Sequence, residues 1–193
     1  MMDLIGIIPT GKVWGLILKD LIVDIKEGFK RAQKDVSIDI LTERPYPIPR
    51  LAFDVDLGKY RVEGFFLKGF DIKTELERMH KISIDKVLIL TDVDLCDPPH
   101  MNGFGYADTT HLFAIVSLYR LGKGANKFIL KERLVKESLH ELGHTYGLEH
   151  CSKSSCPMSV SASVFEIDAK TKEFCPRCVR TLSDTGFGEY WGV

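Results

Sequence analysis

The stretch HELGHTYGLEHC, residues 140–151, restricts the possible folds more than any other part of the chain. His140 and His144 are four residues apart, so on a helix their rings lie on the same face and can reach one ion. A third ligand from the next helical turn would crowd the open side of that ion, so the chain must turn. Gly147 permits the turn, because glycine readily adopts the left-handed backbone that ends helices. His150 follows three residues later, and the stretch therefore predicts a helix, a turn and three histidines around one site.

Glu141 gives this histidine site its catalytic potential. Zinc in catalytic sites takes three protein ligands and leaves one position for a water molecule, whose pKa it lowers. A carboxylate beside that water can take its proton as a general base. The spacing thus predicts zinc on His140, His144 and His150, with Glu141 as the base. Two other interpretations stay open: histidines that only cap a helix, and a zinc site that binds without catalysing.

Four cysteines follow the histidines in two pairs of short spacing. Cys151 and Cys156 form one hook, Cys175 and Cys178 form another, and two such hooks can surround one zinc tetrahedrally. A four-thiolate site has no open position, so we expect it to be structural and to stabilise a segment too irregular for a core. The N-terminus does not resemble an export signal, which favours a metal over the alternative of two disulfides. Because His150 and Cys151 are adjacent, their side chains should diverge, one toward each metal.

The first part of the chain alternates between strand and helix patterns. The predicted strands are residues 2–9, 36–43 and 86–95, and the predicted helices between them are residues 14–33 and 70–81. Asp71 is the expected cap of the second helix, and the strand that follows is continuously apolar, as in strands buried on both faces.

The later part of the chain has a different pattern. Residues 103–120 predict a hairpin at a sheet edge, where an extended peptide could add itself. Residues 126–148 carry an apolar stripe and predict a long helix that ends at Gly147. Residues 175–185 could form a short helix. The sequence as a whole predicts an α/β (α+β) fold with a mixed, twisted sheet.

The composition limits the classes of function. The chain has 45% hydrophobic and 27% charged residues, a net charge of −1, and no apolar run long enough to cross a bilayer. Lysine and arginine form no extended cluster, which argues against nucleic acids and anionic membranes as partners. No sequence feature suggests an obligate oligomer, and we expect a monomer in the cytoplasm.

The residues of the two clusters also carry a family resemblance. The pattern H-E-x-x-H-x-x-G-x-x-H resembles the metzincin clan of zinc metalloproteases, whose members place a methionine turn beneath the metal. Cys151 after the third histidine, Met158 two residues after Cys156, and the pair Cys175 and Cys178 are similar to the archaemetzincins. The resemblance implies a catalytic zinc on the histidines, a second zinc on the four cysteines, and Met158 as the turn methionine. An ordinary packing role for Met158 is the alternative.

Together these features predict a zinc metallopeptidase with two zinc ions, one catalytic and one structural, and a peptide or protein substrate. The metzincin-like catalytic domain would span residues 1–193, with an N-terminal lobe at 1–147 and a zinc-stapled C-terminal lobe at 148–193. The rival interpretations are a zinc-dependent module that binds peptides without turnover, and a structural protein with only the cysteine site occupied.

Overall fold

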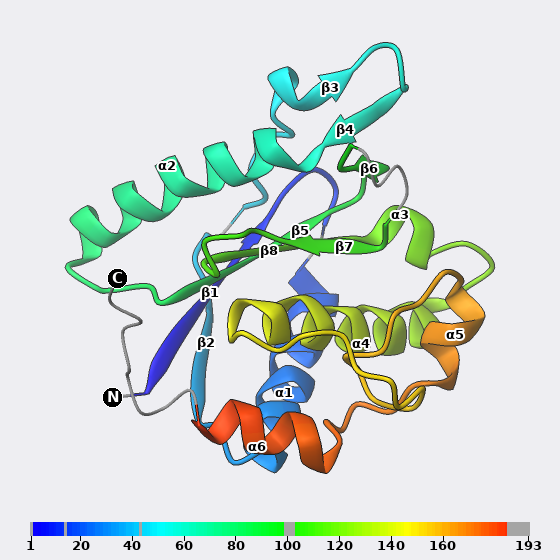
Figure 1. The fold of residues 1–193 in the computed structure, drawn as a ribbon. Helices are drawn as coiled ribbons and strands as arrows, with labels where there is room; N and C mark the ends of the chain where they lie inside the picture. Colours follow the sequence, from blue (N-terminus) through cyan, green and yellow to red (C-terminus); the bar gives the residue numbers. More distant parts are fainter. Residues whose placement is uncertain (1, 14, 43, 99–102, 185–193) are drawn as a thin grey trace, which may run out of the picture.

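The centre of the molecule is a five-stranded sheet (Figure 1), seen in a computed structural model that describes residues 2–13, 15–42, 44–98 and 103–184. Its strands are β1 (Asp3–Pro9), β2 (Val36–Ile40), β5 (Lys86–Thr91), β7 (Gly105–Ala107) and β8 (Phe113–Ser117). They lie in the order β2-β1-β5-β8-β7, and the first four are parallel. The last strand, β7, pairs antiparallel with β8 at the edge. The sheet is therefore mixed, as predicted.

Helices cover both faces of this sheet (Figure 1). Helices α1 (Gly15–Arg31) and α4 (Lys127–Thr145) pack on one face, and α2 (Val62–His80) packs on the other. The side chains of β5 alternate between the two apolar cores: Leu88 and Leu90 point toward α1 and α4, whereas Val87 and Ile89 point toward α2. This confirms the prediction of a strand buried on both faces.

The C-terminal part packs against α4 and α1. It contains the short helices α5 (Val164–Ala169) and α6 (Pro176–Asp184), with no helix or strand among the described residues between α4 and α5. Ile167, Phe174 and Leu182 belong to the same apolar core as α1 and α4. The Arg133 guanidinium on α4 also pairs with the Asp168 carboxylate on α5, at 2.7 Å. The small lobe is therefore fixed to the helix that carries the histidines.

A second, three-stranded sheet lies at the end of α2 and was not predicted. It contains β3 (Phe53–Asp54), β4 (Lys59–Arg61) and β6 (Leu95–Cys96), after a 3-10 turn, η1 (Arg50–Ala52). The predicted strand 86–95 was too long, because β5 ends at Thr91 and β6 joins this other sheet. The short helix α3 (Leu118–Leu121) similarly replaces the end of the predicted hairpin.

The second predicted helix was too short, and Asp71 as its cap is wrong. Helix α2 begins at Val62 with Arg61 as the N-cap residue, so Asp71 lies in mid-helix. Gly64 obscured this start, since glycine lowers helix propensity. Its role is close packing: a side-chain carbon there would lie 2.7 Å from Ala52 Cβ.

The other predicted elements agree with the structure to within a few residues. The predicted ends at residues 14, 43 and 185, and the C-terminal residues of the small lobe, lie outside the described residues. In the part of the chain that the structure describes, no helix combines the length and apolarity needed to cross a membrane.

Candidate metal centres

The three histidines come together where α4 ends. His140 and His144 lie on the last two turns of the helix, and Gly147, at φ +80°, takes the left-handed conformation that lets the chain turn back. The Leu148 N–H donates to Gly143 O at 3.0 Å and closes the helix end. One ring nitrogen from each of His140, His144 and His150 lies within 4.8 Å of the other two. The structure thus brings together the three residues that the sequence singled out.

Two of these rings are held in a fixed orientation by backbone carbonyls. His140 Nδ1 lies 2.8 Å from Pro157 O, and His144 Nδ1 lies 2.7 Å from Leu148 O. A carbonyl oxygen only accepts hydrogen bonds, so each Nδ1 carries the proton and each Nε2 presents a lone pair. The two Nε2 atoms face each other at 3.1 Å. Lone pairs this close repel unless a cation lies between them.

The distances fit zinc. Nitrogen ligands about 2.0–2.1 Å from a tetrahedral zinc lie about 3.3 Å from one another. The observed 3.1 Å between His140 Nε2 and His144 Nε2 is close to this value. His140 is also ready to bind a metal as the neutral ring, because burial and the neighbouring His144 lower its pKa to about 3.

Glu141 lies beside the histidines at the floor of a cavity of about 1060 Å³. The carboxyl group is buried, and both burial and the nearby Glu137 raise its pKa well above the usual range. Gly105 on β7 makes room for it, since a side-chain carbon at Gly105 would lie 2.6 Å from Glu141 Cγ. The cavity therefore contains a base with a high proton affinity next to three available imidazoles.

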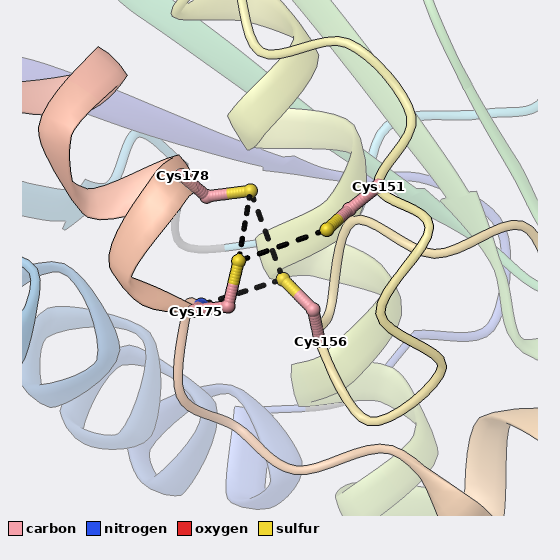
Figure 2. A group of neighbouring side chains, drawn as sticks. All are labelled: Cys151, Cys156, Cys175 and Cys178. Carbon is pink, nitrogen blue, oxygen red and sulfur yellow. Dashed lines mark hydrogen bonds between the residues drawn. The ribbon is translucent and has the colours of Figure 1, made fainter.

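The four cysteines form a separate, closed cluster (Figure 2). All five cysteines of the chain are free thiols, and Cys96 lies outside the cluster, on β6. The Sγ–Sγ distances are 3.6 Å for Cys151 and Cys175, 3.8 Å for Cys156 and Cys178, and 3.7 Å for Cys175 and Cys178. Sulfur ligands about 2.3 Å from a tetrahedral zinc lie about 3.8 Å apart. The cluster has the dimensions of a four-thiolate zinc site rather than of two disulfides.

The short segment from His150 to Met158 connects the two clusters. His150 is exposed and lines the cavity, whereas the next side chain, Cys151, is buried and points into the thiol cluster, as predicted. The Cys151 N–H donates to Met158 O at 2.9 Å. Met158 is fully buried and its sulfur packs so closely on Gly143 that a side chain there would collide with it. Met158 thus lies directly below the histidine-bearing turn of α4.

Two buried charged residues of this region were not predicted. The Lys170 ammonium donates to Pro157 O at 3.1 Å and to Ser159 O at 2.5 Å, and burial lowers its pKa. It therefore holds the same carbonyl that orients His140. Glu137, one turn before Glu141, lines the cavity, and burial raises its pKa to about 7. Neither residue belongs to a local pattern, so only long-range packing could reveal them.

Comparison with known proteins gives the family. The sequence model of Peptidase family M54 matches residues 2–184. The chain belongs to Peptidase family M54. It is 30% identical to the archaemetzincin of Pyrococcus furiosus over 189 residues, which cover 95% of this chain and 94% of that protein. It is 39% identical to the archaemetzincin of Methanocaldococcus jannaschii over 183 residues, which cover 92% of each chain.

Solved structures agree with this assignment. A zinc-dependent peptidase from Methanocorpusculum labreanum superposes with a TM-score of 0.78 at 26% identity, covering 92% of this chain and 99% of that one. The archaemetzincin of Methanopyrus kandleri superposes with a TM-score of 0.74 at 28% identity, covering 95% of both. The predicted family and fold are confirmed, and the M54 chain is a zinc metallopeptidase. Its histidine and cysteine clusters are two groups that could hold zinc.

Proposed function

We propose that this chain hydrolyses peptide bonds at a zinc ion bound by His140, His144 and His150, with Glu141 as the general base. One observation carries the assignment: the Nε2 atoms of His140 and His144 face each other at 3.1 Å, and both Nδ1 atoms are already bonded to carbonyls. A bound zinc would act as a Lewis acid, lowering the pKa of water and polarising the scissile carbonyl.

Glu141 would perform the proton transfers. Its carboxylate takes a proton from the attacking water and gives it to the amine that leaves. Burial and the proximity of Glu137 raise the pKa of this carboxyl group, which strengthens it as a base toward the attacking water. The carbonyl groups of Pro157 and Leu148 keep the two helical histidines in place during these steps.

The cysteine cluster would hold a second, structural zinc on Cys151, Cys156, Cys175 and Cys178, giving two zinc ions per chain. Its Sγ–Sγ spacing and the burial of all four thiols support a closed site without a position for water. Met158 would serve as the methionine beneath the catalytic metal, because it is fully buried against Gly143.

The two lobes, residues 1–147 and 148–193, would form one catalytic domain. Both contribute to one apolar core, which includes Leu139 and Leu142 of α4 as well as Ile167 and Leu182 of the small lobe. We further propose that the protein acts as a monomer in the cytoplasm, on peptide or protein substrates. Size-exclusion chromatography with light scattering would test the oligomeric state.

Substitution of Glu141 by glutamine tests the proposal. Glu141→Gln should keep two zinc ions per chain and lower hydrolysis of a mixed peptide library by about a hundredfold or more, because it removes the base and keeps the shape. Glu149→Gln is the matched control, since Glu149 lines the same cavity but is exposed.

Turnover unchanged in Glu141→Gln would refute Glu141 as the base. Peptide binding by the wild type without any cleavage would instead identify a zinc-dependent peptide-binding module. Zinc analysis by mass spectrometry on the same preparations separates these outcomes from simple loss of the metal.

A further inference from the structure

A second cavity, of about 630 Å³, lies between α2 and the β7–β8 hairpin. We call it the apolar groove, after the large apolar side chains in its wall: Phe66, Leu67, Phe70, Leu112 and Phe113. Leu67 and Phe70 are 66% and 56% exposed although they are large and apolar. Apolar surface gathered in a concave site is typical of a place where another molecule binds.

The apolar groove adjoins the histidine cavity. Tyr106, Ala107 and Asp108 line both of them. These residues belong to or directly follow β7, the edge strand of the main sheet. A molecule bound along β7 would therefore contact the histidine cavity and the apolar groove at the same time.

The backbone of β7 can receive an extended peptide. Ser117 N–H donates to Phe104 O and Asp108 N–H donates to Phe113 O, so the even-numbered residues of this segment bond to β8. Antiparallel pairing alternates, which turns the N–H and C=O groups of Gly105 and Ala107 to the outer side. Among the described residues no strand pairs with β7 on that side.

The two faces of β7 determine where the side chains of such a peptide would go. Gly105 faces Glu141, whereas Tyr106 packs with the core under α2. Directly opposed residues of neighbouring strands point to the same face, and successive residues alternate. A peptide side chain opposite Gly105 would thus point toward the histidines, and one opposite Tyr106 would point into the apolar groove.

We propose that the apolar groove is a specificity site that binds a large apolar side chain of a peptide substrate laid along β7. This rests on the proposed function, because the peptide must also reach the histidine cavity. The described lining of the groove includes the carboxylates of Glu63, Asp97 and Asp108 and no lysine or arginine. An acidic side chain at the same peptide position is repelled, so the site selects Phe or Leu over Asp.

Peptide binding to the Glu141→Gln protein with its zinc retained tests this site without any dependence on turnover. A fluorescent peptide of alanines and serines would carry Phe, Ala or Asp at each position in turn, and the Kd would be measured by anisotropy. We expect Phe to bind about tenfold tighter than Ala at the peptide positions whose side chains point into the groove, since burying its ring removes apolar surface from water. Because side chains alternate along a strand, these positions should be two residues apart. Asp at those positions should bind more weakly than Ala.

A pair of variants of α2 localises the effect. Phe70→Ser, made in the same background, should abolish the preference for Phe over Ala. Met79→Ser should leave it unchanged, because Met79 is a similarly exposed apolar residue of the same helix, at 58%, that does not line the groove. Circular dichroism would verify that both variants are folded.

The outcomes separate this site from the proposed function. Three results would refute the groove as a specificity site. They are equal binding of Phe and Ala peptides, a preference for Phe that survives Phe70→Ser, and no binding of any peptide. If wild type still cleaves peptides in that case, the proposed function stands. A preference for Phe that depends on Phe70, together with no cleavage by wild type, would instead support the groove as a specificity site and refute the proposed function.

Discussion

The two candidate metal centres differ in their exposure to solvent, although neighbouring residues, His150 and Cys151, contribute to them. The histidine centre opens into a cavity, and His150 is exposed. The cysteine centre is closed, with all four thiols no more than 8% exposed. Hydrolysis needs an open metal position for water and substrate, whereas a closed thiolate site serves best to stabilise a segment. With the proposed roles, two adjacent residues would thus join a reactive centre to a structural one.

The centres also differ in what supports them. His140 and His144 lie on α4, a 19-residue helix within the main core. The cysteines lie on an irregular segment and at the start of α6, where few backbone hydrogen bonds belong to regular elements. The histidine centre should therefore need the cysteine centre, because the small lobe carries His150 and the carbonyl of Pro157. The reverse dependence should be weak.

Loss of a thiol ligand should have the largest effect. Cys178→Ser is expected to release the structural zinc, unfold the small lobe and reduce zinc at the histidine centre as well, since structural zinc contributes on the order of 10 kcal/mol to folding. Zinc content by mass spectrometry and unfolding by circular dichroism would measure this. Cys96→Ala is the control, as Cys96 is buried but lies outside the cluster. Full zinc content and native folding in Cys178→Ser would contradict the dependence.

Stepwise removal of metal should have an intermediate effect. It should show that the histidine centre loses zinc more readily than the cysteine centre. A chelator added slowly is expected to remove one zinc per chain first, from the open histidine centre, with activity lost and the fold kept. Removal of the second zinc should coincide with unfolding of the small lobe. Parallel records of zinc release, activity and circular dichroism would show the order. Simultaneous loss of both ions would indicate that the centres have equal access to solvent.

A change in the packing beneath the histidine centre should have the smallest effect on stability and activity. Gly143→Ala places a methyl group against the Met158 sulfur, and we expect it to lower the free energy of unfolding by about 1–3 kcal/mol. Activity should fall as the turn bearing His144 shifts. The double variant Gly143→Ala, Met158→Ala tests the cause, because removing the sulfur should restore part of the stability. No recovery in chemical denaturation would show that Met158 is not the obstacle.

The predictions from local spacing were accurate because the constraint was local. The positions of His140, His144 and Gly147 in one helix and its turn follow from helical geometry, and the structure has them there. The start of α2 was missed, because Gly64 serves a contact with Ala52 that is distant along the chain. The small sheet was missed for a similar reason, since β6 pairs with β4 and each strand is very short.

The sequence by itself determined the metal ligands that were proposed, the candidate base, the family and the alternation of strands and helices, because these depend on residue type and short spacing. Only the tertiary structure decided how the site is built around them. It placed Pro157 O and Lys170 behind His140, Gly105 against Glu141, and the apolar groove beside β7. These contacts join residues far apart along the chain, and their distances are set by the packing of the whole core rather than by any local pattern.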